Sequence, residues 1–157
     1  MNTKWEKRFM EMAFLNASWS KDPSTQVGAV ITHKNRIVSM GFNGYPHGIA
    51  DNQDPREIKL LKVIHAEENA ILHANRSLED CAIFATHFPC PNCTAKIIQV
   101  GIKTIYVPDF DEDYFSRWKD FLDVSKALIA EASIEVIKVD GFIERANTKT
   151  SHTCSSC

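Results

Sequence analysis

The sequence lacks a strong net charge of either sign. Its 157 residues include 18 Lys and Arg against 20 Asp and Glu, which gives a formal net charge of -2. Proteins that bind long nucleic acids usually carry a broad positive field. The charge balance therefore favours a small ligand over a nucleic-acid polymer as the partner.

The sequence also lacks a long apolar run at its beginning. The first stretch, "MNTKWEKRFMEMAFLNASW", places charged residues between its apolar ones. A signal peptide or a membrane span needs an uninterrupted apolar segment. We therefore predict a cytoplasmic protein that does not contact a membrane.

Cysteine is scarce, with five residues in an odd-numbered, irregular distribution. That pattern excludes the disulfide framework of a small secreted domain. In a reducing compartment these cysteines would be free thiols or metal ligands.

The apolar residues that are present follow helical and strand periodicities. We expect a helix over 3–18, a hairpin formed by "VGAVIT" and "RIVSMGF", and then three units of helix followed by strand. The helices are expected at 54–75, 91–100 and 118–129, and the strands at 81–86, 103–108 and 134–139. Asp54 should be the N-cap of the first helix, and Pro91 should begin the second.

This alternation predicts an α/β fold with a mixed sheet of about five strands covered on both faces, a three-layer α/β/α sandwich. Residues 1–140 are expected to form a single domain. The periodicity ends at Gly141, so residues 141–157 are predicted to be a mobile tail that includes His152, Cys154 and Cys157.

A candidate metal site is formed by His65, Cys90 and Cys93. A catalytic zinc takes three protein ligands and keeps its fourth position for water. Pro91 would place both cysteines on the first turn of a helix, where the helix dipole and free N–H groups favour thiolate. On its own, a Cys-x-x-Cys pair also suits a redox site, and a single histidine is often an ordinary polar residue.

Glu67 strengthens the metal interpretation. Two residues apart in mid-helix, His65 and Glu67 would point in opposing directions, but on a first turn that faces a pocket both could reach one centre. A carboxylate there could take a proton from water and return it to a leaving amine. Glu68 is expected to face solvent.

His-x-Glu followed by Pro-Cys-x-x-Cys is the known signature of zinc nucleobase deaminases. The match extends over "SKDPSTQVGAVI", "GFNGYPHG", "REIKLLKVIHAEENAIL" and "FPCPNCTAKIIQVGI". From near Ser20 to Val139 the chain resembles the deoxycytidylate deaminase family. The resemblance implies the cytidine deaminase fold, one Zn²⁺ per subunit and hydrolysis of dCMP to dUMP and ammonia, which supplies dUMP for dTMP synthesis.

The resemblance also implies roles for individual residues. His65, Cys90 and Cys93 would hold the zinc, and Glu67 would be the catalytic proton shuttle. The backbone at Ala66 and Thr86 would hold the edge of the base. Candidates for contacts with the phosphate are Lys21, Ser24, Thr25 and Gln26. Asn43 is a candidate for the sugar hydroxyl or for a nucleotide bound nearby, and Tyr114 and Arg117 are weaker candidates. Several of these could instead serve only local turn geometry.

Members of this family are often hexameric and regulated, with dCTP activating and dTTP inhibiting through a second nucleotide site that includes a Gly-x-Asn-Gly loop. Here that loop is "GFNG". The resemblance thus implies a homo-oligomer, with a hexamer as the expected form, and Mg²⁺ that accompanies a regulatory nucleotide. His33, His47, His73 and His87 are assigned structural or surface roles, and Trp118 is assigned to the core.

The sequence is also compatible with two other functions. An RNA-acting adenosine deaminase has the same metal motif but must bind a polyanion, which the near-neutral charge disfavours. A non-catalytic structural zinc module would need a fourth protein ligand and would leave Glu67 without a role.

Overall fold

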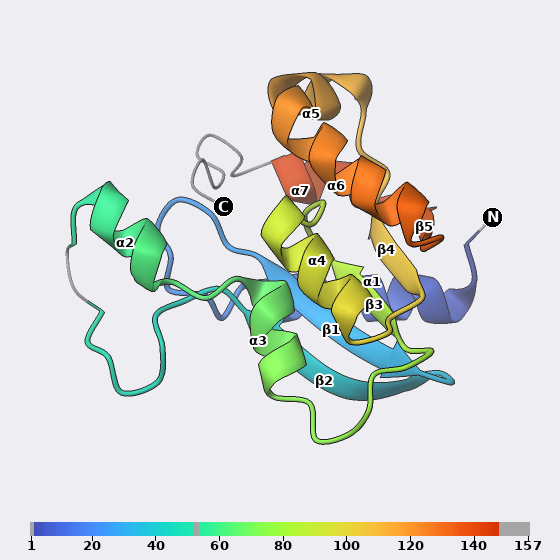
Figure 1. Cartoon of the computed structure of the whole chain (residues 1–157), viewed down its shortest axis with the longest axis horizontal. Helices are drawn as coiled ribbons and strands as arrows, with labels where there is room; N and C mark the ends of the chain where they lie inside the picture. The colour runs from blue at the N-terminus through green and yellow to red at the C-terminus, as the bar shows by residue number, and fades with distance from the viewer. Residues whose placement is uncertain (1, 52–53, 148–157) are drawn as a thin grey trace.

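The computed structural model describes residues 2–51 and 54–147. Its centre is a five-stranded mixed sheet with strand order β2-β1-β3-β4-β5 (Figure 1). The antiparallel hairpin comprises β1 (Gly28–His33) and β2 (Arg36–Phe42), and β1 also pairs antiparallel with β3 (Ala82–Ala85). β4 (Thr104–Pro108) and β5 (Glu135–Val139) continue the sheet in parallel with β3. The predicted mixed sheet of about five strands is confirmed.

Helices cover both faces of this sheet. α1 (Lys4–Ala17) packs on one face, where Met10 and Ala13 form a buried cluster with Val30, Phe84 and Val139. The other face carries α3 (Ala66–Leu72), α4 (Pro91–Gln99) and α6 (Lys119–Glu131), which lie in front of the sheet in Figure 1. The larger core, which includes Ile31, Ile83, Ile97 and Ile105, lies between the sheet and these helices. The three-layer α/β/α prediction is therefore correct.

The strand directions bring several loops to one edge of the sheet. β3 and β4 end at this edge, and β1 begins there because it runs antiparallel to β3. β2 also ends there, since Gly28 is paired with Phe42. The segments that precede β1 and that follow β2, β3 and β4 consequently meet, although they are far apart in the sequence.

The single helix predicted at 54–75 is wrong in one respect, because the structure has two helices there. α2 (Arg56–Lys62) is followed by Val63 at its C-cap position, and the chain runs extended to His65 before α3 begins. Ile64 exchanges two backbone hydrogen bonds with Gly44, at 2.8 and 3.1 Å. This pairing with a distant loop interrupts the helix, a tertiary effect that local periodicity does not encode.

Asp54 is not the helix cap predicted from the sequence. The N-cap position is Pro55, and no side chain caps this end of α2. Asp54 instead accepts hydrogen bonds from Lys62 Nζ at 2.9 Å and from the Tyr45 hydroxyl at 3.2 Å. Lysine offers this carboxylate a charged partner, which a backbone N–H does not. Pro91 does begin α4 as predicted, and Gly101 follows its end with φ +86°.

Two short helices were not expected. α5 (Glu112–Arg117) precedes α6, capped by Asp111, whose Oδ1 accepts from the Tyr114 N–H. α7 (Ile143–Asn147) follows β5, with Phe142 and Ala146 buried in the core. Residues 141–147 therefore pack on the domain where the sequence suggested a tail, because these two apolar side chains find a place between layers. Residues 148–157, with His152, Cys154 and Cys157, lie outside the described residues.

Among the described residues, no helix combines the length and apolar character that crossing a membrane requires.

Candidate active site

A cleft opens at the edge of the sheet where the loops meet. It has about 820 Å³ of unoccupied space, part of it open to solvent. Its wall contains His65, Glu67 and Cys90, three of the four residues predicted to carry the chemistry, and also Ala66. Most of the remaining lining is apolar or aromatic, which is typical of a small-molecule site.

The three predicted metal ligands come together at this cleft. The Nδ1 atom of His65 lies 3.5 Å from Cys90 Sγ and 3.4 Å from Cys93 Sγ. A tetrahedral zinc with its usual Zn–S and Zn–N bond lengths would separate nitrogen and sulfur ligands by about 3.5 Å. All three ligand atoms lie within 4.8 Å of one another. The spacing therefore fits one tetrahedral ion.

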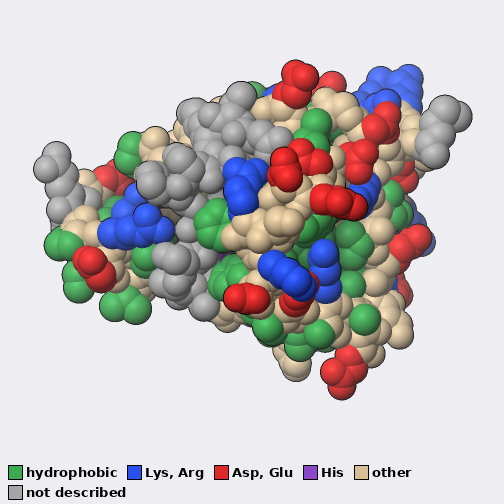
Figure 2. Space-filling model, turned by 90° about the horizontal axis from the view of Figure 1, so that it is seen from above, with side chains coloured by type: hydrophobic (Ala, Val, Ile, Leu, Met, Phe, Trp, Pro, Cys, Tyr) green, Lys and Arg blue, Asp and Glu red, His purple; other side chains and the backbone are tan. Residues whose placement is uncertain are grey.

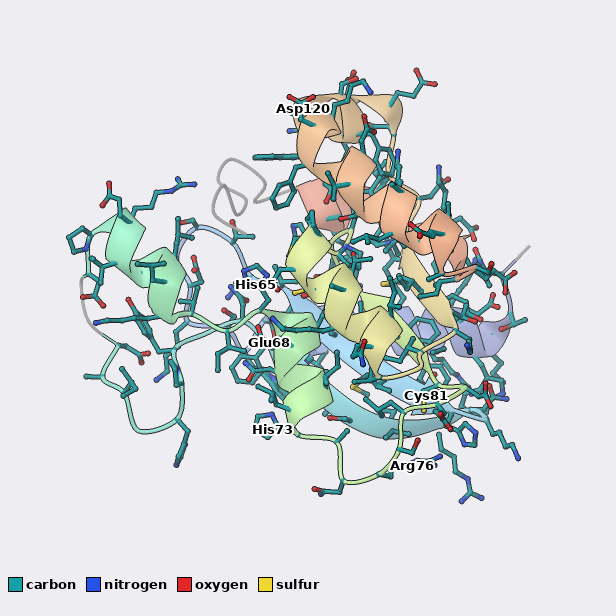
Figure 3. The ribbon with its side chains drawn as sticks, in the orientation of Figure 1. His65, Glu68, His73, Arg76, Cys81 and Asp120 are labelled. Atoms are coloured by element: carbon teal, nitrogen blue, oxygen red, sulfur yellow. The ribbon has the colours of Figure 1, made fainter. Side chains whose placement is uncertain are left out.

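Local structure explains why these atoms converge. Cys90 is the N-cap of α4, with Pro91 in its first turn, and the Cys93 N–H donates to Cys90 Sγ at 3.4 Å. His65 is the N-cap of α3 and has extended backbone (ψ 157°). Figure 3 places His65 at the start of α3, whereas Cys81, the other described cysteine, lies far from it. Cys81 is buried and immediately precedes β3.

The two neighbouring thiols of Cys90 and Cys93 would be stabilised as thiolates by a bound cation. The pKa of the Cys93 thiol is raised, first by its hydrogen bond with Cys90, then by burial and by the nearby carboxylate of Glu67. Two adjacent buried sulfurs beside a carboxylate can both ionise only when a positive ion lies between them. No fourth His, Cys, Asp or Glu side chain within residues 2–51 and 54–147 joins this cluster. The donor set is thus that of an open site rather than a closed structural one.

Glu67 occupies the second helical position of α3 and is only 4% exposed. The break between α2 and α3 allows it to reach the same cleft as His65. The next residue, Glu68, is partly exposed and forms an ion pair with Lys96 at 3.3 Å. The sequence predicted that Glu68 faces solvent, but its carboxylate also has a partner on α4. Figure 3 labels Glu68 on the outer side of α3.

Gly41 fixes the depth of α3 against the sheet. A Cβ atom at this position would collide with backbone atoms of Ala66 and Ala70. Because Gly41 has no side chain, the first turn of α3 lies directly on β2. This close contact sets the position of Ala66 and Glu67 relative to the cleft.

The predicted substrate residues fall into two groups. Thr25, Asn43, Ala66 and Tyr114 line the cleft together with His65 and Cys90. Ser24, Gln26 and Thr86 are not part of its wall; Gln26 Nε2 donates to Ser20 O at 2.8 Å. Lys21 forms an exposed ion pair with Asp51 at 2.7 Å, and Arg117 Nε donates to Asp113 O at 3.3 Å.

Asn43 is held in the cleft wall by the backbone. Its Oδ1 accepts from the Val27 N–H at 2.9 Å, and its Nδ2 donates to Thr25 O at 2.9 Å. These bonds tie the end of β2 to the segment before β1. Asn43 therefore has a structural task in addition to any contact with a ligand.

Asp22 was not among the predicted site residues, but it lines the cleft. It accepts from the backbone N–H groups of Ser24 and Thr25 at 2.8 and 3.0 Å, and pairs with Lys59 at 2.7 Å. Burial alone would raise the pKa of Asp22, but the hydrogen bonds from Lys59, Thr25 and Ser24 outweigh it, and the pKa is lowered. Asp22 is therefore the charged centre of this turn.

His87 and Trp118 also line the cleft, and the sequence assigned neither of them to the site. His87 follows Thr86 at the end of β3, and Trp118 separates α5 from α6. The only sequence signal for His87 is its position three residues before Cys90. Trp118 has none, because its place depends on how α5 and α6 pack.

Comparisons with known proteins agree with this geometry. The family model described as the cytidine and deoxycytidylate deaminase zinc-binding region matches residues 3–108. The chain is 62% identical over 138 residues to the "Uncharacterized deaminase in luxG 3'region" of Aliivibrio fischeri, covering 87% of this chain and 94% of the relative. It is 36% identical over 163 residues to the deoxycytidylate deaminase of Pongo abelii, covering 93% and 92%.

A solved structure shows the same fold. The dCMP deaminase of cyanophage S-TIM5, in complex with dCMP and dUMP, aligns with a TM-score of 0.71 at 28% identity and covers 88% of this chain and 99% of that one. The chain therefore belongs to the cytidine and deoxycytidylate deaminase family, and it is a hydrolytic deaminase that carries that family's zinc-binding region.

Proposed function

We propose that the protein hydrolyses dCMP to dUMP and ammonia and so supplies dUMP for dTMP synthesis. Its relative from Pongo abelii is a deoxycytidylate deaminase, and the structurally similar cyanophage enzyme has been solved with dCMP and dUMP. The observation that carries the proposal is the location of the buried Glu67 carboxylate in one cleft with His65 and Cys90, whose ligand atoms, with that of Cys93, have zinc spacing.

The roles of the chain's own residues follow from this arrangement. His65, Cys90 and Cys93 would hold one Zn²⁺ per chain. A zinc with three protein ligands lowers the pKa of water from its bulk value to about 7, which makes a nucleophile at neutral pH. The remaining steps are proton transfers, and Glu67 would make them.

Glu67 acts as the general base and then as the general acid. Its carboxylate takes one proton from the water that attacks C4 of the pyrimidine and delivers it to N3. It then takes the second proton of that water and delivers it to the exocyclic amine, which leaves as ammonia. The C4–N bond breaks as the C4–O bond becomes a carbonyl, so the products are dUMP and NH₃. A buried position favours this work because it excludes bulk water from the carboxylate.

The contacts with the substrate are also proposals. The buried backbone of Ala66 and Thr86 would hold the base edge, and Tyr114, Thr25 and Asn43 in the cleft wall would meet the sugar. Ser24 and Gln26, beside this wall, would approach the phosphate. The turn around Asp22 supports this placement for Ser24 and Thr25, because Asp22 accepts from both of their backbone N–H groups before β1.

The proposal is tested by an ultraviolet assay of the zinc-loaded protein with dCMP, deoxycytidine and CMP. Conversion of dCMP in preference to the other two supports the full proposal. Equal rates with dCMP and deoxycytidine would refute the phosphate contacts. Failure to convert any of them, with salt-dependent binding and deamination of RNA, would favour the RNA-acting alternative.

Regulation and assembly extend the proposal. A second groove of about 1,390 Å³ adjoins the cleft, and its wall includes Trp19, Lys21, Phe42, Asn43 and Tyr45. It would accept a regulatory dCTP or dTTP with Mg²⁺. The same ultraviolet assay with each nucleotide added, with and without Mg²⁺, tests this.

We also propose that the protein forms a homo-oligomer, a hexamer. The exposed surface of α2 supports this proposal. No residue of this helix is buried, and its Leu61 is 82% exposed. Figure 2 shows hydrophobic side chains on the end of the molecule that α2 occupies in Figure 1. Sedimentation of the wild type and Leu61→Lys tests whether α2 forms a contact between copies.

A further inference from the structure

The carbonyl oxygen of Pro89 accepts hydrogen bonds from two buried hydroxyl groups. Ser125 Oγ donates to it at 2.8 Å, and Thr94 Oγ1 donates to it at 3.3 Å. Both hydroxyl residues are 0% exposed, and Pro89 is buried as well. A backbone carbonyl oxygen has two lone pairs, so the two donors satisfy it. This carbonyl immediately precedes Cys90, one of the three residues with zinc spacing.

Ser125 reaches Pro89 from a distant part of the chain. It lies in the middle of α6, 36 residues beyond Pro89, and shares a buried helix face with Leu122 and Ile129. α6 packs against α4, and the two helices lie side by side in Figure 1. A hydroxyl buried on an apolar face needs a partner, and a serine in mid-helix commonly bonds to its own helix. Here the hydroxyl donates across the helix contact to the segment that carries Cys90.

The backbone around Cys90 has little other freedom. The proline rings fix φ at Pro89 and Pro91, and a residue before proline is confined to extended conformations. Cys90 accordingly has φ -67° and ψ 164°. The remaining soft motion is rotation of the peptide plane that joins Pro89 to Cys90. The Pro89 carbonyl belongs to that plane, so its two hydroxyl partners set the direction in which the Cys90 side chain leaves the backbone.

The direction of the Cys90 side chain matters for metal binding. Its Sγ atom lies 3.5 Å from His65 Nδ1, a separation that suits two ligands of one zinc. Groups that orient metal ligands through hydrogen bonds typically contribute about 10- to 100-fold to metal affinity. α6 also forms part of the cleft wall through Phe121 and Leu122. The bond from Ser125 therefore connects a metal ligand to the helix that lines the substrate cleft.

We propose that Ser125 is a positioning residue for the zinc site. Its hydroxyl, together with that of Thr94, holds the Pro89 carbonyl so that Cys90 presents its sulfur to the ion at a fixed place relative to the cleft wall. Ser125 acts through Cys90 and is not itself a ligand. The inference rests on the proposed function for the zinc ligands, and it assigns α6 a part in holding the metal.

The test uses pairs of variants at buried hydroxyl groups. Ser125→Ala removes the shorter of the two bonds, Thr94→Val removes the longer one and keeps the branched shape, and Thr94→Ser keeps the hydroxyl. Ser39→Ala is the matched control. Ser39 is also buried, and its Oγ donates at 2.7 Å to the carbonyl of Ala70, which precedes no zinc ligand.

The main measured quantity is the zinc dissociation constant, obtained by competition with a chelating indicator on protein stripped of metal. Ser125→Ala should raise this constant roughly 10-fold. Thr94→Val should raise it about 3-fold, because its bond is longer. The double variant should exceed the product of the two effects, since the buried carbonyl then loses both hydroxyl donors. Thr94→Ser and Ser39→Ala should match the wild type.

Two further measurements separate positioning from general stability. Urea unfolding of the metal-free proteins should show similar losses for Ser125→Ala and Ser39→Ala, because each removes one buried hydrogen bond. A domain of ordinary stability stays almost entirely folded after such a loss, so the loss alone does not change the zinc dissociation constant. The visible absorption of the Co²⁺-loaded protein, which depends on coordination geometry, should change in Ser125→Ala and not in Ser39→Ala.

An unchanged zinc dissociation constant and Co²⁺ spectrum in Ser125→Ala would make the bond a packing contact and overturn the inference, even if the wild type converts dCMP. An equal rise in the constant for Ser39→Ala would also overturn it. If Ser125→Ala does not fold, a rise for Thr94→Val that is absent in Thr94→Ser supports the inference, and equal values overturn it.

Activity with dCMP is measured separately, so the two proposals can fail independently. A wild type that binds one zinc and does not convert dCMP, with weaker zinc binding in Ser125→Ala, contradicts the proposed function and supports this inference. A wild type that binds no zinc contradicts both.

Discussion

Glu67 follows His65 by only two residues, and both side chains nevertheless line the same cleft. In a continuous helix, residues at this spacing point in opposing directions. The backbone pairing of Ile64 with Gly44 keeps the chain extended up to His65, and α3 begins at Ala66. A short extended segment between two helices thus places the metal ligand and the carboxylate at one centre.

Glu67→Gln should keep zinc and lose turnover. The amide has nearly the shape of the carboxylate but cannot accept and return protons. General acid/base groups typically contribute about 10²- to 10⁴-fold, so kcat should fall by at least about 100-fold. Metal analysis and the ultraviolet assay check both parts. Glu68→Gln, which removes only the ion pair with Lys96 on the outer side of α3, is the control and should stay near wild type. A near-normal rate for zinc-loaded Glu67→Gln would remove Glu67 from the chemistry.

Cys90→Ala should abolish zinc binding, and Cys81→Ala should not. Cys90 lies in the cluster with His65 and Cys93, whereas Cys81 is a buried thiol outside it. Removing one of three protein ligands leaves only two for the ion. Metal content per chain should fall from about one to near zero for Cys90→Ala and stay at about one for Cys81→Ala. A protein that loses zinc in both variants, or in neither, would contradict the assignment of ligands.

Gly41→Ala should displace α3 and reduce both stability and activity. A Cβ at Gly41 meets the backbone of Ala66 and Ala70, which cannot move without shifting the helix. Overpacking of this kind typically costs about 1–3 kcal/mol of unfolding free energy. Urea unfolding and kcat measure the two effects.

Gly44→Ala is the matched control for that substitution, because a Cβ at Gly44 has no atom within 4 Å. It should unfold close to the wild type and keep its activity. Equal destabilisation by the two variants would show that the fit of α3 against β2 is not what positions the site.

The sequence alone identified the reactive groups of the site, but it did not identify all the residues that line the cleft. His65, Cys90 and Cys93 are recognisable because ligand type and the Pro91 helix start are local properties of the chain. Asp54 could not be assigned correctly, since its partner Lys62 lies at the other end of α2 and the capping pattern considers only the first turn of a helix. The positions of His87 and Trp118 in the cleft wall likewise depend on segments that meet at one sheet edge, and no spacing in the sequence predicts which segments meet.

The titration of His87 should make the protein less stable in acid. Burial lowers the pKa of His87 from 6.5 to about 4. Between these two values the unfolded chain binds a proton at this residue and the folded chain does not, so the free energy of unfolding falls as the pH falls from about 6.5 to about 4. A shift of this size corresponds to roughly 3 kcal/mol over the whole window.

His87→Gln isolates this contribution because every other titrating group, including the zinc ligands, is shared with the wild type. Urea unfolding at pH 7, 6 and 5 gives the free energy of unfolding of both proteins. The wild type should lose more stability than His87→Gln at each step down in pH, and the two should show the same slope above about pH 7. Parallel curves from pH 7 to pH 5 would mean that His87 titrates alike in the folded and unfolded chains, which is incompatible with a buried, neutral imidazole in the cleft wall.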